Sequence, residues 1–179
     1  MSNFTKYFIK YRSFIGIVAL IFVLYLSHPD AKSILIGFLL ILTGIFLRGW
    51  ASGYLKKNRE LATQGPYALT RNPLYFSNLI LGTGIAVAAN SIYGYFIFIA
   101  YYLIFFPALI LIENKKLKEL FGKEYENWAK GLNTFFPKFK KVNFKGFNIS
   151  YYMRNREYKT LYFSLFIVIV LIFKAILTY

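Results

Sequence analysis

The residues best suited to chemistry gather in residues 64–75, a polar stretch between two long apolar runs. Gly65-Pro66 and Asn72-Pro73 are turn-forming pairs, and each proline disfavours helical geometry at the residue before it. Pro73 can also begin a helix, since a proline in the first turn loses no intrahelical hydrogen bond. We therefore predict a rigid ledge at a membrane surface. The side chains that it would present are those of Tyr67, Arg71, Asn72 and Tyr75.

Four charged residues lie at or near the borders between polar and apolar sequence, namely Arg48, Glu60, Arg71 and Glu113. A charge at the edge of a membrane is costly, so each of them is a candidate for a functional site. The planar guanidinium of Arg71 can bind a carboxylate through two parallel hydrogen bonds. For all four residues, a snorkelling side chain or a plain ion pair is the alternative.

The apolar runs that must position these residues are long enough to cross a bilayer, which takes roughly 20 residues. Hydrophobic residues make up 58% of the chain, which exceeds the share in soluble domains. We predict an all-α, polytopic integral membrane protein that forms a single transmembrane domain over residues 1–179. The five predicted transmembrane helices cover about residues 11–27, 34–55, 74–90, 92–112 and 161–177.

Residues 113–130 are predicted to form a cytosolic amphipathic helix. Apolar side chains recur there at helical spacing, with lysines between them, and a helix of this kind lies in the membrane interface. Two pairs of small residues, Gly49 with Gly53 and Gly82 with Ala86, have the spacing that lets neighbouring helices approach closely.

Basic residues predict the orientation in the membrane. All but three of the 22 Lys and Arg residues fall in residues 1–12, 56–72 and 113–160. Five crossings place these segments on one side, which the positive-inside rule assigns to the cytosol, so the N-terminus and the catalytic face are predicted to be cytosolic. Contact with anionic lipid headgroups explains the net charge of +15, and nothing in the sequence resembles a nucleic-acid-binding module.

The chain has no cysteine and a single histidine, His28. Thiol nucleophiles, thiolate zinc sites and iron–sulfur clusters are thereby excluded, and one histidine cannot build a metal cluster. We therefore predict no metal site. The sequence leaves the oligomeric state open.

An ordered series of short motifs extends over about residues 34–139. It includes Leu47-Arg48-Gly49-Trp50, Gly65-Pro66-Tyr67, Arg71-Asn72-Pro73-Leu74-Tyr75, Glu113-Asn114, Phe121-Gly122-Lys123-Glu124-Tyr125, Trp128 and Phe136-Pro137. In this order and spacing the series closely resembles the isoprenylcysteine carboxyl methyltransferase family, and the related phospholipid methyltransferases share its central blocks. The resemblance implies a membrane-embedded enzyme that uses S-adenosyl-L-methionine without a soluble Rossmann domain.

The resemblance also implies roles for individual residues. Arg71 and Glu113 are the expected catalytic residues, and Arg48 and Glu60 are expected to support the substrate or the site around it. The residues expected to bind the cofactor are Tyr67, Arg71, Asn72, Pro73, Tyr75 and Glu113. Where the family often has a histidine this chain has Asn72, and where it often has two glutamates this chain has Glu113-Asn114.

The expected reaction is methyl transfer to a lipophilic or membrane-borne acceptor, with the cofactor entering from the cytosol and the acceptor from the bilayer. Positioning and desolvation should supply most of the catalysis of such an in-line displacement. A carboxylate acceptor needs no base, whereas for an amine or thiol Glu113 would be the only local candidate. The alternatives are a membrane NADPH-dependent reductase of sterol-reductase-like architecture and a non-enzymatic membrane scaffold or transporter.

Overall fold

The computed structural model describes residues 3–57, 59–138, 142 and 146–178. This part of the chain is all-α, as predicted, with six α-helices and one short 3₁₀-helix, η1. The helices are α1 (Asn3–Tyr25), α2 (Ala31–Ser52), η1 (Gly65–Ala68), α3 (Pro73–Ala89), α4 (Ile92–Ala129), α5 (Ile149–Arg154) and α6 (Tyr158–Thr178).

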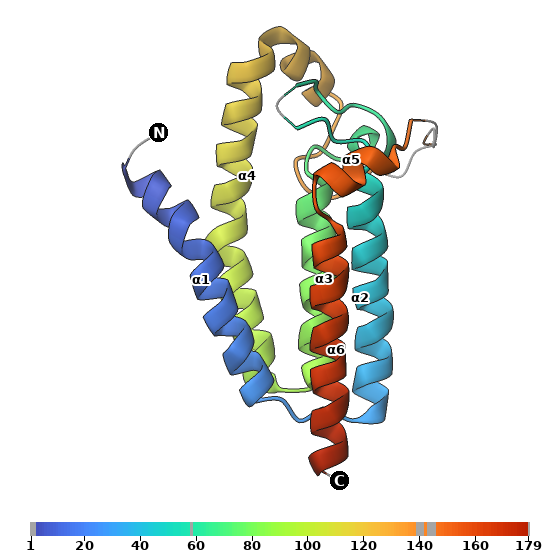
Figure 1. Ribbon diagram of the computed structural model, residues 1–179. Helices are drawn as coiled ribbons and strands as arrows, with labels where there is room; N and C mark the ends of the chain where they lie inside the picture. The colour runs from blue at the N-terminus through green and yellow to red at the C-terminus, as the bar shows by residue number, and fades with distance from the viewer. Residues whose placement is uncertain (1–2, 58, 139–141, 143–145, 179) are drawn as a thin grey trace.

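Five long helices run up and down the molecule. In Figure 1, α2, α3 and α6 run side by side, whereas α1 and α4 form a second pair that leans away from them towards one end. The loop between α2 and α3, the chain that follows α4, and α5 gather at that end (Figure 1). The C-terminus and the turns at residues 26–30 and 90–91 lie at the opposite end. We call the two ends the ledge end and the turn end.

The outer faces of these helices suit lipid rather than water. Three helices, α2, α4 and α6, are long and apolar enough to cross a membrane, and α3 is a shorter apolar helix. Large apolar side chains such as Leu35, Phe96 and Phe166 are more than half exposed on them. Exposed apolar area on this scale, on helices that satisfy their own backbone hydrogen bonds, is typical of a multi-pass membrane protein.

Local hydrogen bonds set the ends of the helices at the turn end. The Asp30 carboxylate accepts from the backbone N–H of Ser33 at 2.8 Å, and the Asp30 N–H donates to the Ser33 hydroxyl at 3.0 Å. This reciprocal cap starts α2 at Ala31, three residues before the predicted start. Asn90 ends α3 in a left-handed conformation, and its side chain donates to Asp30 at 3.0 Å, which joins the two turns.

Two predicted helix boundaries need correction. The first helix begins at Asn3 rather than at residue 11, because no glycine or proline precedes Tyr11 and a helix does not have to end where the apolar sequence ends. The predicted interfacial helix over residues 113–130 is not a separate element. It is the continuation of α4, which passes Pro107 without interruption and reaches Gly122 before its backbone leaves helical geometry.

The segment beyond Gly122 therefore covers protein rather than lipid. Gly122 has a φ of 49°, a left-handed value that glycine adopts freely, and the chain turns back over the ledge end (Figure 1). Tyr125 is buried there, and the indole N–H of Trp128 donates to the carbonyl oxygen of Tyr67 at 3.3 Å. An amphipathic pattern predicts that one helix face is covered, but it does not say whether lipid or protein covers it.

Glycines bring α2 and α3 into backbone contact. A Cβ atom at Gly37 would lie 2.5 Å from the Ala88 Cβ and 2.6 Å from the Gly84 carbonyl oxygen. Gly82 also serves packing, as predicted, because it lies against the Phe98 ring of α4. Gly49 and Gly53, by contrast, face Tyr152 and Phe147 near the ledge end rather than another membrane helix. Gly44 of α2 lies similarly close to Leu81 of α3 at the same contact.

We expect Gly37→Ala to destabilise the protein. Alanine is the better helix former, but its methyl group would overlap backbone atoms of α3 that cannot move independently, and overpacking of this kind costs about 1–3 kcal/mol. Thermal unfolding in neutral detergent measures the effect. Gly131→Ala is the control, because nothing lies within 4 Å of the added methyl group there; equal melting temperatures for both variants would contradict the close α2–α3 contact.

Candidate functional site

The ledge is joined to the chain that follows α4. Thr70 and Asn133 form a parallel β-bridge, and the N–H of Arg71 donates to the Asn133 carbonyl oxygen at 3.1 Å. The N–H of Lys138 donates to the carbonyl oxygen of Leu69 at 2.9 Å. Backbone pairing on both sides of Thr70, which is itself buried, gives the ledge the rigidity that its turn-forming pairs predict.

Arg71 uses only part of its guanidinium group to hold this loop. Its Nε–H donates to the carbonyl oxygen of Leu132 at 3.0 Å, and the side chain is half-buried. Its two terminal nitrogens make no hydrogen bond to any residue that the structure describes. Those two nitrogens are the edge with which arginine binds a carboxylate or phosphate.

Asn72 connects the two motif segments that the sequence suggested would meet. It is only 4% exposed, and its amide nitrogen donates to the Thr134 carbonyl oxygen at 2.8 Å. The same nitrogen lies 3.5 Å from the Asn114 side-chain oxygen, next to Glu113. The structure thus shows Asn72 fastening the ledge to α4, whereas its contact with a cofactor stays a prediction.

We expect Asn72→Asp to loosen the ledge. The substitution keeps the shape but replaces the donor with an oxygen that faces the Thr134 carbonyl and the Asn114 oxygen, and a buried group left without its hydrogen bond costs about 1–3 kcal/mol or more when charged. Limited proteolysis after residue 64 and thermal unfolding measure this. Asn133→Asp is the matched control, since Asn133 contributes its backbone carbonyl and its side chain is exposed; equal effects would contradict the role of Asn72.

Tyr67, Tyr75 and Glu113 lie near one another at the ledge end. Burial raises the pKa of Tyr67, and the carboxylates of Glu113 and Glu157 raise that pKa further. Tyr67 is therefore a neutral phenol at physiological pH. Glu113 and Arg12 both act electrostatically on the phenol of Tyr75. Glu113 itself is half-buried and makes no ion pair within the described ranges of the chain.

Pro73 and Glu60 have simpler surroundings. Pro73 is buried and begins α3, as its position after Asn72 predicts. Glu60 is 63% exposed and pairs with Lys56, four residues earlier in the loop between α2 and η1. It borders a separate cavity of about 400 Å³ together with residues of the α2–α3 loop and of the chain before α5, and no contact described above joins it to Arg71 or Glu113.

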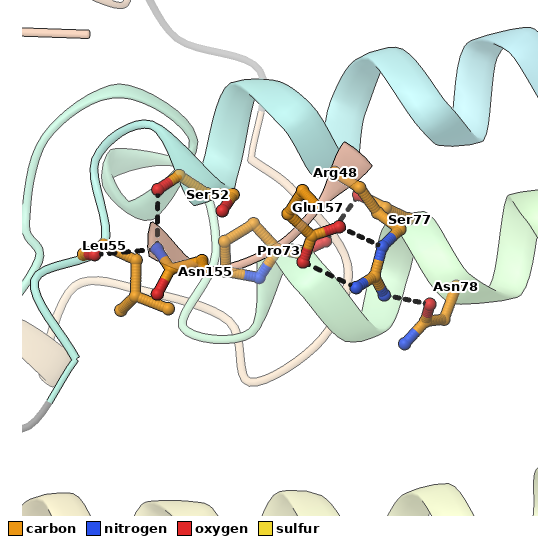
Figure 2. A network of polar contacts seen from close by, with 8 residues as sticks. All are labelled: Arg48, Ser52, Leu55, Pro73, Ser77, Asn78, Asn155 and Glu157. Atoms are coloured by element: carbon orange, nitrogen blue, oxygen red, sulfur yellow. Dashed lines mark hydrogen bonds and ion pairs between the residues drawn. The ribbon is translucent and has the colours of Figure 1, made fainter. Parts of the chain in front are cut away.

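Arg48 forms a largely buried ion pair, the alternative that its sequence position left open, with a partner that the sequence did not identify (Figure 2). Its Nη2 and Nε donate to the two carboxylate oxygens of Glu157 at 2.8 and 3.0 Å, and its Nη1 donates to the side-chain oxygen of Asn78. Asn155 donates to the carbonyl oxygens of Ser52 and Leu55 beside it (Figure 2). These contacts fasten the start of α6 to the end of α2.

A large cavity lies between the α1–α4 pair and the other helices. Its volume is about 1150 Å³, and most of its lining is apolar. Arg12, Arg48, Asn78 and Lys159 are among its polar lining residues. The wall of the cavity reaches the ledge at Tyr75.

Two aromatic residues of the cavity wall contact Tyr75 directly. The hydroxyl of Tyr102 donates to the Tyr75 carbonyl oxygen at 3.1 Å, and the ring of Phe106 meets the ring of Tyr75 edge-on at 5.7 Å between centroids. Tyr75 thus contacts this wall, and the carboxylate of Glu113 acts electrostatically on its phenol.

Comparison with known proteins assigns the family. The family model described as phospholipid methyltransferase matches residues 32–124, just over half of the chain. The chain belongs to the phospholipid methyltransferase family. The matched residues include Arg48, the whole ledge and Glu113, and they end before α5 and α6. The resemblance seen in the ordered motifs is confirmed.

Two curated relatives of the chain are named as metal-resistance proteins. The cobalt-zinc-cadmium resistance protein CzcN of Cupriavidus metallidurans is 32% identical over 93 residues, which cover 51% of this chain and 43% of the relative. The nickel-cobalt-cadmium resistance protein NccN of Alcaligenes xylosoxydans xylosoxydans is 30% identical over 111 residues, which cover 61% and 52%. The chain thus spans about half the length of the curated relatives it matches. No solved structure matches it.

Proposed function

We propose that this chain transfers a methyl group from S-adenosylmethionine to a lipophilic, membrane-borne acceptor. The observation that carries the proposal is the meeting of two distant motif segments at one end of an apolar cavity. Asn72 joins the ledge to the Glu113-Asn114 segment, and Tyr75 of the ledge contacts Tyr102 and Phe106 of the cavity wall. Family membership supports the same reaction.

The side chains at the ledge end fit this cofactor, which carries a carboxylate, an ammonium group, an adenosine and a sulfonium. Arg71 has two guanidinium nitrogens available for the carboxylate. Glu113, which is unpaired in the described part of the chain, would hold the ammonium group or the ribose hydroxyls. The aromatic faces of Tyr67 and Tyr75 are suited to a cation. When bound, the cofactor supplies an activated methyl group for in-line displacement.

The chain's own contribution is to position the reactants and exclude water. The buried Tyr67, covered by Trp128, keeps one side of the ledge dry, which strengthens electrostatic contacts made there. Glu113 would accept the proton of an amine or thiol acceptor, whereas a carboxylate acceptor needs no base. The backbone and Nε of Arg71 are both fixed by the chain after α4. Arg71 would therefore orient the cofactor rather than take part in the reaction.

The proposed orientation places the ledge end in the cytosol. The described parts of the basic segments at residues 1–12, 56–72 and 113–160 lie towards this end (Figure 1), and the positive-inside rule assigns such segments to the cytosolic side. The cofactor would then reach Arg71 and Glu113 from water. The acceptor would reach the cavity from the bilayer, between helices whose outer faces are apolar.

Family membership favours methyl transfer over an NADPH-dependent reductase or a non-enzymatic scaffold. Among the described residues, no three His, Cys, Asp or Glu side chains come together in a way that could hold a metal ion. The metals in the names of the relatives describe those proteins.

Calorimetry on the purified protein in neutral detergent tests the proposal. We expect S-adenosylhomocysteine, the product of the donor, to bind with one-to-one stoichiometry, and NADPH to release no heat and not to compete. A cooperative thermal transition establishes that the sample is folded. Absence of S-adenosylhomocysteine binding by such a sample would refute the proposal, and NADPH binding in its place would support the reductase.

A further inference from the structure

The large cavity has two chemically different ends. Towards the turn end it is lined by apolar side chains, including Val23 and Ile167 of a buried cluster, with Leu20, Ile85 and Ile97 packed against that cluster. Its other end holds the charged lining residues. Among the described lining residues three are basic, Arg12, Arg48 and Lys159, and none is acidic.

Two of these three cations have no ion-pair partner among the described residues. Arg48 is neutralised by Glu157. The side chains of Arg12 and Lys159 make no ion pair or hydrogen bond with any part of the chain that the structure describes. Arg12 is half-buried and Lys159 is exposed at the rim of the cavity, so the two charges leave this end of it electropositive and favour an anion there.

The positions of Arg12 and Lys159 along the molecule support a single anion site shared by both. Lys159 follows the start of α6, which the pair of Arg48 and Glu157 fastens to α2 at the ledge end. Arg12 lies in α1, where it acts electrostatically on Tyr75, and its own carbonyl oxygen accepts from the hydroxyl of Tyr101 at 3.3 Å. Both cations therefore lie towards Tyr75 and away from the apolar end.

The volume matches an amphiphile better than a compact metabolite. Ligand pockets commonly have about 300–1,000 Å³, and this cavity exceeds that range at about 1150 Å³ with a mostly apolar lining. An apolar tail can occupy the apolar end among Leu20, Ile85 and Ile97, while a charged group remains beside the cations.

We propose that Arg12 and Lys159 are specificity-determining residues that select an acceptor carrying a carboxylate or phosphate group next to an apolar tail. This inference rests on the proposed methyl transfer. Both residues lie outside residues 32–124, the span that the family model matches. The family core would thus bind the donor, while the flanking helices α1 and α6 choose the acceptor.

Native mass spectrometry of the full chain in a neutral detergent tests this with probes that share one tail. The probes are dodecyl phosphate, dodecanoate, dodecyl glucoside and dodecyltrimethylammonium, with inorganic phosphate as the anion without a tail. We expect the two anionic amphiphiles to bind at least about tenfold more tightly than the neutral one, as a charged hydrogen bond would give. Inorganic phosphate that binds as tightly as dodecyl phosphate would overturn the amphiphile and indicate a site for free anions.

Charge-removing variants locate the site. Arg12→Gln with Lys159→Gln should abolish the preference for anionic probes, whereas Arg12→Lys with Lys159→Arg and the exposed control Lys116→Gln should keep it. Each single glutamine variant should lower the preference severalfold, which keeps the test decisive where the double variant fails to fold. An unchanged preference in the glutamine variants would overturn the inference. Calorimetry with S-adenosylhomocysteine on the wild-type sample tests the proposed methyl transfer independently. Binding of S-adenosylhomocysteine without a preference for anionic probes would overturn this inference alone.

Discussion

Glu113→Gln is expected to weaken S-adenosylhomocysteine binding by about 10- to 100-fold, the loss that follows when a charged hydrogen bond becomes a neutral one. Glutamine keeps the size of the side chain and removes only its charge. Because Glu113 makes no ion pair within the described residues, its substitution should leave the melting temperature close to that of the wild type. Calorimetry measures the affinity, and thermal unfolding measures the stability.

Glu119→Gln is the matched control for this prediction. It removes the same charge from the same helix six residues later, where the side chain is exposed, and it should leave the affinity unchanged. Wild-type affinity in Glu113→Gln would remove Glu113 from the cofactor site. Arg71→Ala is the less specific test, because it also removes the hydrogen bond to Leu132 and would loosen the loop after α4.

Glu157→Ala should destabilise the protein by about 3–5 kcal/mol, the usual cost of removing one partner from a buried ion pair. Glu157 is 9% exposed, and the substitution would leave the Arg48 guanidinium charged and partly buried, with Asn78 as its remaining partner among the described residues. The start of α6 would also lose its attachment to α2. Unfolding in mixed detergent micelles measures the change.

Two further variants check that the ion pair causes the effect. Glu126→Ala removes a carboxylate from an exposed pair with Lys118 and should change stability little, because surface pairs contribute little. Arg48→Met combined with Glu157→Leu should recover most of the loss, since an apolar pair of similar volume avoids the uncompensated charge. A wild-type transition in Glu157→Ala would contradict the pairing shown in Figure 2.

The apolar runs predicted most of the helical framework. Pro73 and Asn90 bound α3 within one residue of the prediction, and α6 differs from its predicted start by three residues. These positions were predictable because first-turn prolines and left-handed asparagines act locally. The extension of α4 past Glu113 was not, because the helical spacing of its apolar residues is the same whether lipid or the ledge covers them.

The candidate site was predictable only where its residues share a motif. The ledge and the Glu113-Asn114 segment were expected to meet, and the contact between Asn72 and Asn114 joins them. The pair of Arg48 with Glu157 links positions 109 residues apart, and no local pattern connects the two. One signal was available: each charge ends or begins an apolar run on the same predicted side of the membrane. Arg12 and Lys159 become neighbours of one cavity only through the packing of α1 and α6.

The central claim is methyl transfer to a membrane-borne acceptor, and its most direct test is mass spectrometry of lipids from cells fed methyl-labelled methionine. Cells expressing the wild-type protein are compared with cells expressing Glu113→Gln at equal levels. We predict a lipid-extractable species that gains a labelled methyl group with the wild type and shows only background label with the variant. Identical lipid labelling in the two cultures would contradict the account.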